Sequence, residues 1–320
     1  MKRDSKVKKL YYLARPMIPR RVQLSMRRKL IALQRDEFSD SWPILKSASK
    51  PPMGWRGWPE GKQFAVVLTH DVELKRGHDR CRKLMSIEEE LGFRSSFNFV
   101  PERYDVSANL RAEIQERGFE VGVHGLNHDG KLYRSKDEFR KRSQRINHYL
   151  ADWGVAGFRS PAMHHNLDWI RMLNIQYDCS TFDTDPFEPQ SDGVGTIFPF
   201  WVESSQGFDG YVELPYTLAQ DFTLFVLMEE PTIRIWEKKL DWIAQNGGMV
   251  LLYTHPDYMR CGSEKPGIEE YYVDRYIDVL GYLNERYRGD FWHVLPGEMA
   301  RYWSEHVESD KNTSDVGFVL

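Results

Sequence analysis

The sequence predicts an α/β protein in which a mostly parallel sheet is covered by helices, as in a barrel. Short apolar runs alternate along the chain with helix-like stretches, which is typical of parallel strands joined by crossover helices. Polar residues follow several of these runs, as expected where chemistry gathers on the carboxyl-terminal face of a barrel. A chain of 320 residues can bury one large core, and many barrels of this size are single domains.

The expected elements follow one another from residue 64. Short apolar or aromatic segments predict three strands, at residues 64–68, 95–100 and 120–123. Helix-like stretches separate or follow them, at residues 80–91, 109–117 and 135–153. Further short segments predict strands at residues 157–159, 175–178, 210–214 and 249–253. This succession of strand and helix favours a parallel sheet.

Composition divides the chain into four parts. Residues 1–41 form a basic amphipathic extension, and residues 42–61 are rich in proline and glycine, which predicts a linker. We expect the catalytic barrel over residues 62–305 and a polar tail over residues 306–320. The barrel therefore starts close to the first expected strand.

Basic residues dominate the N-terminal extension. Between residues 2 and 29 there are eleven lysine and arginine residues and one acidic residue, Asp4, with apolar residues at irregular intervals. In one reading, residues 1–35 lie on the anionic headgroups of a membrane. In the other, they form a helix that packs on the barrel and leaves its basic face in solvent. The sequence leaves both readings open.

Two histidines and two acidic residues predict a metal-dependent hydrolase. His124 and His128 lie four residues apart, on a helical turn or short loop where two neutral imidazoles can bind one divalent cation. Asp71 and Glu73 follow the first expected strand, and alternation along it points both side chains to the same side. One carboxylate can then bind the metal while the other transfers a proton. His255 follows another expected strand in the same way.

Four short motifs occur in a fixed order along the chain. They are Thr-x-Asp at Asp71, His-x-x-x-His at His124 and His128, Gly-Phe-Arg-Ser-Pro at Arg159, and Leu-x-x-x-His-Pro at His255. In this order they resemble the motifs of the polysaccharide deacetylases, the NodB-homology group of carbohydrate esterases. The resemblance covers roughly residues 60–300. It implies a distorted (β/α)7 barrel that removes an acetyl group from an acetylated carbohydrate.

The resemblance also implies how the metal is bound. Asp71 would be the general base, and His124 and His128 would bind a divalent metal, which we expect to be Zn²⁺. Most members have two adjacent aspartates, whereas here Val72 follows Asp71 and the next carboxylate is Glu73. A subgroup with an Asp-x-Asp spacing is more similar, which makes Glu73 the expected third ligand.

Three further residues complete the implied catalytic machinery. Arg159 would hold Asp71 ionised and in position, and His255 would act as the general acid. Asp178 matches the fourth motif of the family, and we expect it to set the pKa of His255.

The segment from Glu213 to Asp221 is polar, aromatic and loop-like, which suits substrate recognition. We expect Glu213, Tyr216 and Asp221 to bind the acetylated carbohydrate. Because relatives of the group hydrolyse other amides, a linear or cyclic non-sugar amide is an alternative substrate. A catalytically silent scaffold at a membrane is a third reading, although a scaffold needs neither a base nor an acid.

Composition also bears on partners and compartment. The net charge of −3 gives no overall attraction to nucleic acid, and we expect no nucleic-acid partner. The sequence has no apolar run of about 18 residues for a membrane span, and its N-terminus lacks the apolar core of a secretory signal. Three widely spaced cysteines suit a reducing compartment. We therefore expect a cytoplasmic protein, peripheral on the inner membrane face if the extension binds lipid.

Overall fold

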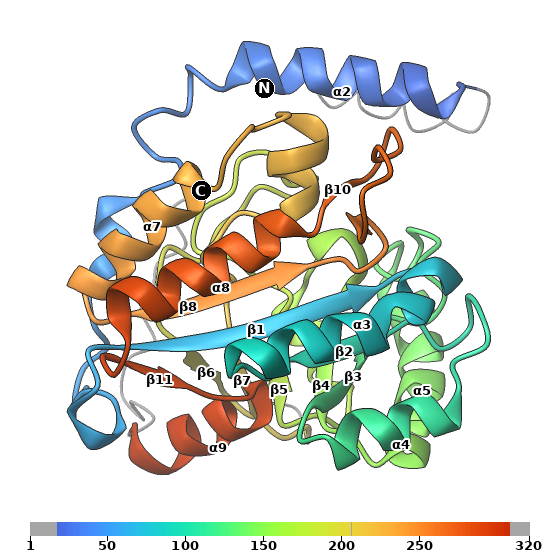
Figure 1. Ribbon diagram of the computed structural model, residues 1–320. Coiled ribbons are helices and arrows are strands. Elements are labelled where there is room, and N and C mark those ends of the chain that lie inside the picture. Colours follow the sequence, from blue (N-terminus) through green and yellow to red (C-terminus); the bar gives the residue numbers. More distant parts are fainter. Residues whose placement is uncertain (1–17, 206, 308–320) are drawn as a thin grey trace.

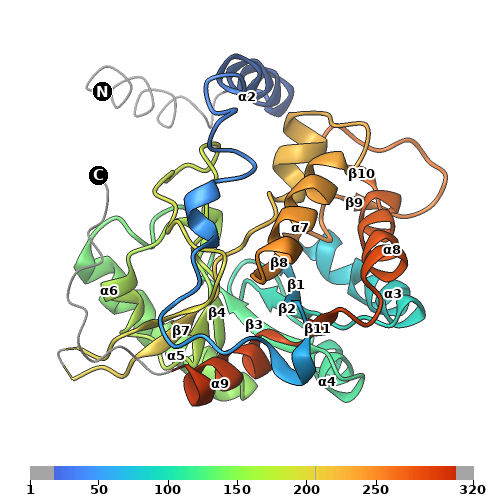
Figure 2. The same cartoon turned by 90° about the vertical axis from the view of Figure 1, so that its left-hand side faces the viewer.

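A curled sheet of nine strands forms the centre of the protein (Figure 1). The computed structural model describes residues 18–205 and 207–307. The strands follow the order β11-β1-β2-β3-β4-β5-β7-β6, and β8 pairs with β1. The antiparallel pair of β6 with β7 lies at one end of an otherwise parallel arrangement. Viewed along the strands, the sheet encloses most of a ring with helices outside it (Figure 2).

The elements have the following bounds. The strands of the sheet are β1 (Phe64–Val72), β2 (Ser96–Phe99), β3 (Glu120–His124), β4 (Gly157–Arg159), β5 (Tyr177–Asp178), β6 (Phe200–Val202), β7 (Tyr211–Glu213), β8 (Met249–Thr254) and β11 (Phe291–His293). A separate pair consists of β9 (Met259–Arg260) and β10 (Tyr271–Tyr272). The α-helices are α2 (Arg20–Gln34), α3 (Lys75–Leu91), α4 (Ala108–Glu116), α5 (Lys136–Trp153), α6 (Leu167–Ile170), α7 (Arg234–Gln245), α8 (Asp274–Tyr287) and α9 (Pro296–His306). Shorter helices are η2 (Lys46–Ser49), η3 (Pro59–Gly61), η4 (Pro161–Met163) and the π-helix η5 (Phe222–Leu227).

The predicted distorted (β/α)7 barrel is confirmed. All seven expected strands are present, and α3, α4 and α5 correspond to the three expected helices, although α3 begins at Lys75, ahead of residue 80. Strands β6 and β11 were not expected. Each has only three residues, which is too short for a clear pattern in the sequence, and β11 pairs with the distant β1.

Strand β1 is longer than expected because its polar residues have buried partners. We expected it to end at residue 68, where polar residues begin, but it continues to Val72 and all nine residues are buried. Nδ1 of His70 lies 2.8 Å from the hydroxyl of Thr254, and Nε2 lies 2.6 Å from Oε1 of Glu88. These partners satisfy the imidazole, so the strand can continue through the core.

The register of β1 positions two other strands. On one side β1 pairs with β8, from Ala65 opposite Met249 to His70 opposite Thr254. On the other side, beginning at Thr69, it pairs with β2. Because all three strands are parallel, their carboxyl ends lie at the same side of the barrel.

The gap between β7 and β8 is closed by residues 216–218 rather than by a full strand. Isolated parallel bridges join Phe182 to Tyr216 and Leu218 to Leu252. The hydroxyl of Thr217 donates to the carbonyl of Met249 (2.9 Å) and accepts from the backbone N–H of Leu251 (3.0 Å). This side-chain link explains why the barrel is distorted at this point.

Residues 42–61, expected as a linker, pack along the barrel (Figure 2). Trp42, Ala48 and Trp58 are buried, and the indole of Trp58 donates to the carbonyl of Gly247 (2.8 Å). The prolines and glycines of residues 42–61 indicated a linker, but this segment packs against the barrel. Residues 1–17 of the expected N-terminal extension and residues 308–320 of the expected polar tail lie outside the described residues.

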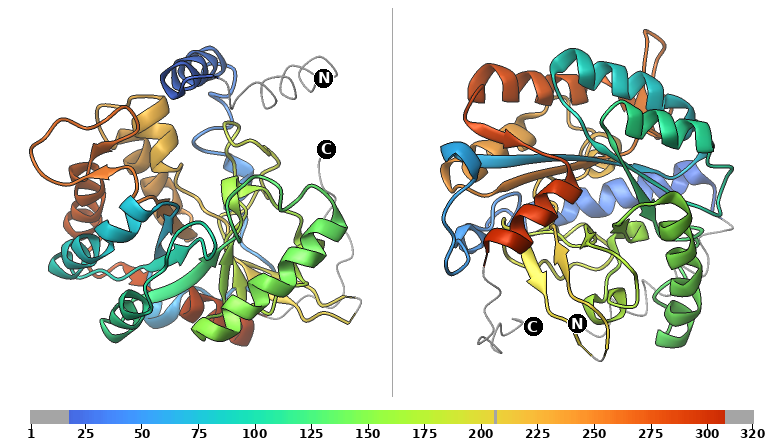
Figure 3. Two further views of the ribbon diagram at one scale, coloured as in Figure 1. Left: turned by 90° about the vertical axis from the view of Figure 1, so that its right-hand side faces the viewer. Right: turned by 90° about the horizontal axis from the view of Figure 1, so that it is seen from below.

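Helix α2 packs on the outside of the barrel, beside η5 (Figures 2 and 3). Leu24 and Ile31 form its buried face. Among residues 18–205 and 207–307, no helix is both long enough and apolar enough to cross a membrane. The structure therefore shows α2 as a helix packed on the barrel, which is the second of the two alternatives for the N-terminal extension. Contact of residues 1–35 with lipid stays a prediction.

A buried ion pair joins Lys239 of α7 to Asp183, which follows β5 along the chain. Nζ of Lys239 contacts the carboxylate of Asp183 and lies 2.6 Å from the carbonyl oxygen of Pro43. Both charged side chains are buried. Burial raises the pKa of Asp183 to about 6, although Lys239 acts to lower it.

Lys239→Met should lower the free energy of unfolding by about 3–5 kcal/mol near neutral pH, because Asp183 is left buried without its counter-charge. The loss should shrink below about pH 6, where Asp183 is protonated in the folded protein. Urea unfolding at about pH 5 and pH 8 measures both values. Lys238→Met, at the exposed neighbouring position, is the control. A loss that is equal at the two pH values would contradict the ion-pair explanation.

Candidate metal centre and active site

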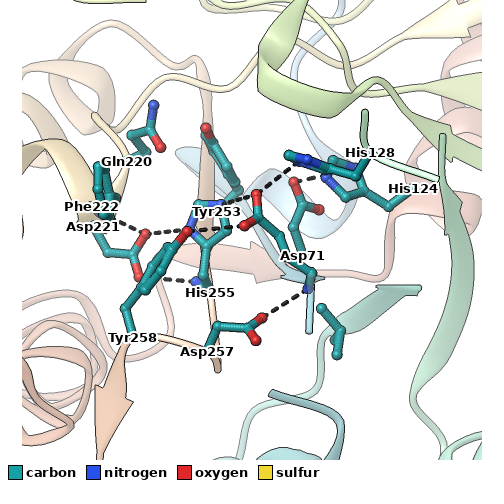
Figure 4. A network of polar contacts seen from close by, with 12 residues as sticks. Asp71, His124, His128, Gln220, Asp221, Phe222, Tyr253, His255, Asp257 and Tyr258 are labelled. Atoms are coloured by element: carbon teal, nitrogen blue, oxygen red, sulfur yellow. Dashed lines mark hydrogen bonds and ion pairs between the residues drawn. The ribbon is translucent and has the colours of Figure 1, made fainter. Parts of the chain in front are cut away.

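The carboxyl ends of four parallel strands bring most of the predicted site residues together (Figure 4). Asp71 lies near the end of β1, with Glu73 just after it. His124 and Arg159 end β3 and β4, and His255 follows β8. The site is therefore assembled from segments far apart in sequence by the parallel pairing of the sheet.

Glu73, His124 and His128 form a cluster that could hold a metal ion. One ligand atom from each lies within 4.8 Å of the other two, and Nε2 of His128 is 2.9 Å from Oε1 of Glu73. Nδ1 of His124 donates to the carbonyl of Arg159 (3.1 Å), which leaves a lone pair on Nε2. This buried Nε2 has no hydrogen-bond partner among the described residues. An unsatisfied buried nitrogen beside a carboxylate and a second imidazole fits a divalent cation.

The electrostatics of Glu73 also suit a metal ligand. Burial would raise the pKa of Glu73, but the charge and hydrogen bond of His128, together with His255 and His124, hold it well below its ordinary value. The carboxylate is thus ionised, as a metal ligand must be.

A tight turn carries His128 back toward His124. Gly125 (φ 61°) and His128 (φ 50°) both have a left-handed backbone, so the pair spans a loop rather than a helical turn. A Cβ at Gly125 would lie 2.4 Å from Cγ of Pro161, the proline of the Gly-Phe-Arg-Ser-Pro motif. A histidine at positive φ costs on the order of 1–3 kcal/mol, a strain that is often found at functional sites.

Asp71 is buried beside the cluster and held by two donors. Nδ2 of Asn98 donates to its Oδ1 (3.0 Å), and Nη1 of Arg159 lies 3.2 Å from the same oxygen. Burial would raise the pKa of Asp71, but the charges of His124, Arg159 and His255 lower it below its ordinary value. Because burial lowers the pKa of His124 to about 4 whereas the pKa of His255 is raised to about 9, Arg159 and His255 are the neighbouring cations that persist near neutral pH. Asp71 is therefore ionised.

Arg159 is fully buried and fixed on several sides. Its Nη1 donates to the hydroxyl of Thr69 (2.8 Å), and its Nε donates to the carbonyl of Cys179 (2.8 Å). The guanidinium also lies 4.7 Å from the ring centroid of Tyr253. These contacts leave the group little freedom to turn away from Asp71.

His255 is held from behind by Asp221 (Figure 4). Nδ1 of His255 lies 2.7 Å from Oδ1 of Asp221, whose Oδ2 accepts from the backbone N–H of His255 (2.9 Å) and from the hydroxyl of Tyr271 (2.8 Å). Burial would lower the pKa of His255, but Asp221, with help from Glu73 and Asp71, raises it to about 9. Nε2 of His255 faces the cluster, 4.0 Å from Oε1 of Glu73.

Our expectation that Asp178 sets the pKa of His255 was wrong, because Asp221 is the residue bound to His255. Asp178 instead interacts with Glu213, and burial raises the pKa of both carboxyl groups. Ser180 donates to Oδ1 of Asp178 (2.5 Å), and the hydroxyl of Thr181 donates to Oε1 of Glu213 (2.6 Å). Besides burial, the charge of Asp178 raises the pKa of Glu213, so a proton on one of the two would relieve their repulsion, which suits a structural pair.

The structure does not support direct substrate contact for Glu213, Tyr216 and Asp221, because all three are at most 1% exposed and bind protein groups. The hydroxyl of Tyr216 lies 2.9 Å from Asp185 and 2.8 Å from Glu188. The segment looked like an exposed loop, but residues 216–218 close the barrel and draw their neighbours into the core.

Two residues after His255 were missed by the sequence analysis. Asp257 accepts backbone N–H groups from Glu73 (2.8 Å), Leu74 (3.0 Å) and Gly77 (3.1 Å), so it fixes the end of β1 and the start of α3. The hydroxyl of Tyr258 donates to Oε2 of Glu73 (2.9 Å), which leaves Oε1 toward the histidines. The only signal in the sequence is their nearness to the His-Pro motif.

Three solved structures are similar to this chain. One is a protein from Mycobacterium smegmatis assigned to the polysaccharide deacetylases. The match covers 83% of this chain and 98% of that protein's chain, with a TM-score of 0.62 and 18% sequence identity. The Puue allantoinase also covers 83% and 98%, with a TM-score of 0.59 and 12% identity. A Pseudomonas aeruginosa PAO1 protein assigned to the same group as the first covers 81% and 96%, with a TM-score of 0.59 and 13% identity.

No protein-family profile matches the sequence, and no curated protein matches it significantly. The structural likeness shows that the chain has the barrel fold of the polysaccharide deacetylases, as the motifs led us to expect.

Gly77→Ala should displace Asp257 and destabilise the protein by about 1–3 kcal/mol, because the new Cβ would lie 2.4 Å from Oδ2 of Asp257. Gly281→Ala in α8 is the matched control, because nothing lies within 4 Å of its Cβ, and it should gain about 0.5–1 kcal/mol. Thermal unfolding of the two variants compares them. Equal stability of Gly77→Ala and Gly281→Ala would show that Asp257 is not confined in this way.

Proposed function

We propose that this protein is a metal-dependent hydrolase that removes an acetyl group from an acetylated carbohydrate. The observation that carries the proposal is the meeting of ligand atoms from Glu73, His124 and His128 beside an ionised Asp71. We propose Zn²⁺ as the metal, because three such ligands are typical of catalytic zinc sites with open positions. The fold of the polysaccharide deacetylases favours an acetylated sugar as the substrate.

In this proposal Asp71 is the general base. A divalent cation held by Glu73, His124 and His128 would polarise the acyl carbonyl and lower the pKa of a water molecule. Oδ1 of Asp71 already accepts from Asn98 and Arg159, so Oδ2 is the oxygen that receives the proton of the attacking water.

His255 is the proposed general acid. Asp221 accepts from Nδ1, so the proton on Nε2 is the one that can be donated to the departing amine or alkoxide. His255 follows β8 whereas Asp71 lies on β1, so the donor and the acceptor of protons come from different strands. Asp221 also stabilises the imidazolium until the proton leaves.

A cyclic amide is the second candidate substrate, favoured by the likeness of the fold to the Puue allantoinase. The same base and acid would serve ring opening of a cyclic amide. Parallel assays of acetate release from acetylated sugars and of hydrolysis of allantoin separate the two candidates, since each assay detects its own product.

We also propose a cytoplasmic location, with residues 1–35 in contact with an anionic membrane surface. The support is the sequence: a basic N-terminal segment and cysteines suited to a reducing compartment. Fractionation of cells that produce the full-length chain tests this proposal. Recovery from outside the cytoplasm would contradict it.

Asp71→Asn and His255→Ala should bind metal normally but release acetate about 10²–10⁴-fold more slowly, because each removes a proton-transfer group and no ligand. His128→Ala should lose both metal and activity. Metal content by plasma mass spectrometry and acetate release from acetylated sugars measure these effects.

His148→Ala is the control for these variants, since it removes an exposed histidine from α5. Wild-type turnover in both Asp71→Asn and His255→Ala would contradict the mechanism. Normal metal content in His128→Ala would contradict the ligand assignment.

The alkaline limb of the pH profile of kcat/KM should report the pKa of His255, which Asp221 raises. His255 must be protonated to act as an acid, so activity should fall as the pH rises through its pKa, which Asp221 raises to about 9. Asp221→Asn removes that negative charge, so the alkaline limb should move to lower pH by about one unit or more. Asp278→Asn, on the surface of α8, should leave the profile unchanged. An unmoved limb in Asp221→Asn would assign it to another group.

A further inference from the structure

Helix α2 exposes a row of large apolar side chains on its outer face. Val22, Met26, Leu30 and Leu33, which we call the outer stripe, are 47%, 47%, 52% and 81% exposed. Their spacing of four, four and three residues puts them on one side of the helix. They are four of the eight large apolar side chains that are exposed within residues 18–205 and 207–307. Such clustering on one short element marks an interaction surface.

Ion pairs from α2, and from Arg35 directly after it, fix the helix to the barrel. Arg20, Arg28 and Arg35 lie 2.5, 2.9 and 2.5 Å from carboxylate oxygens of Glu269, Glu229 and Glu230. Nε of Arg28 also donates to the carbonyl of Val226 in η5 (3.0 Å). The orientation of α2, and with it the outward direction of the outer stripe, is therefore determined by contacts with the barrel.

Basic residues flank the outer stripe. Arg21 and Lys29 are exposed, and they immediately precede Val22 and Leu30 of the outer stripe. Six of the seven charged residues among residues 1–17, which precede the helix, are basic, whereas the net charge of the whole chain is −3. Positive charge is thus concentrated at the end of the chain that carries the outer stripe.

We infer that α2 docks the protein on an anionic lipid surface through the outer stripe, so that the barrel meets its substrate at a membrane. An apolar stripe flanked by lysine and arginine is typical of helices that lie in the membrane interface. Anionic headgroups complement the flanking charges, whereas a second copy seated on the same stripe would bring Arg21 and Lys29 against like charges.

Helix α2 contacts two segments, η5 and the residues before Tyr271, that lie next to the residues holding His255. The guanidinium of Arg27 lies 5.4 Å from the ring centroid of Phe222, the first residue of η5. Asp221 directly precedes Phe222 and accepts the backbone N–H of Phe222 (2.9 Å). The same carboxylate binds Nδ1 of His255. Glu269, the partner of Arg20, is two residues before Tyr271, which donates to Asp221. Both segments follow strands on the side of the barrel that carries the site.

The substrate class follows from this attachment, and this step rests on the proposed deacetylase function. A barrel held at a membrane by the segments beside its own site would act on an acetylated sugar carried by a membrane-anchored lipid. A water-soluble sugar would gain nothing from the docking.

Vesicle co-sedimentation of the full chain tests the docking, with phosphatidylcholine vesicles that contain or lack phosphatidylglycerol. Met26→Gln/Leu30→Gln should weaken binding to the anionic vesicles about tenfold or more, because two apolar side chains no longer insert. The matched control, Ser25→Gln/Ala32→Gln, adds the same residues to the exposed side of α2 outside the outer stripe. It should bind like the wild type. Binding should also fall with salt.

Two results would overturn the docking. One is equal binding by Met26→Gln/Leu30→Gln and the wild type. The other is a wild-type protein that binds neither kind of vesicle and is a dimer by light scattering, while Met26→Gln/Leu30→Gln is a monomer. That result would assign the stripe to self-association. Neither measurement depends on catalysis, so failure of the proposed deacetylase function would leave the docking test intact.

The substrate class has its own test. Acetate release from a lipid-linked acetylated sugar in anionic vesicles should fall about tenfold or more in Met26→Gln/Leu30→Gln, whereas release from a water-soluble acetylated sugar should not change. A parallel loss on both substrates would contradict a role restricted to docking. No release from either substrate by the wild type would reject the deacetylase proposal, while vesicle binding would still be judged separately.

Discussion

The parallel pairing of β1 with β8 on one side and β2 on the other is the constraint on which the site depends. The pairing brings the end of β1, with Asp71 and Glu73, beside the end of β8, with His255. Asp257, just beyond β8, then binds three backbone N–H groups at the start of α3. A shift of β8 by one residue would turn its side chains to the other face and remove the acid from the cluster.

Burial accounts for the division of labour between the two carboxylates after β1. A buried carboxylate stays ionised only beside positive charge or hydrogen-bond donors. Asp71 has Arg159 and Asn98 and is thus held by the protein alone. Glu73 faces the imidazoles of His124 and His128, whose buried Nε2 atoms both lack a hydrogen-bond partner among the described residues, and the three residues form a set of donors for a cation. The longer glutamate suits its position one residue past the strand, where Tyr258 fixes one of its oxygens.

Much of the fold and the core of the site could be predicted from the sequence, because both depend on local patterns. The apolar runs marked the seven strands that were expected, and the residues after them marked Asp71, Glu73, His124, His128, Arg159 and His255. The partner of His255 could not be predicted in this way. Asp178 ends the short strand β5, whereas Asp221 lies beyond β7, and only the closure of the barrel at residues 216–218 brings Asp221 to the imidazole. For the same reason Glu213 and Tyr216, which read as loop residues, are core residues.

The central claim is that Glu73, His124 and His128 bind one divalent cation while Asp71 remains free as the base. An anomalous-diffraction map of crystals grown with Zn²⁺ tests it most directly. The claim predicts one strong peak with Glu73, His124 and His128 at about 2.0–2.2 Å, and with no oxygen of Asp71 in the coordination shell. A peak coordinated by Asp71 in place of Glu73, or no peak at the cluster, would contradict it.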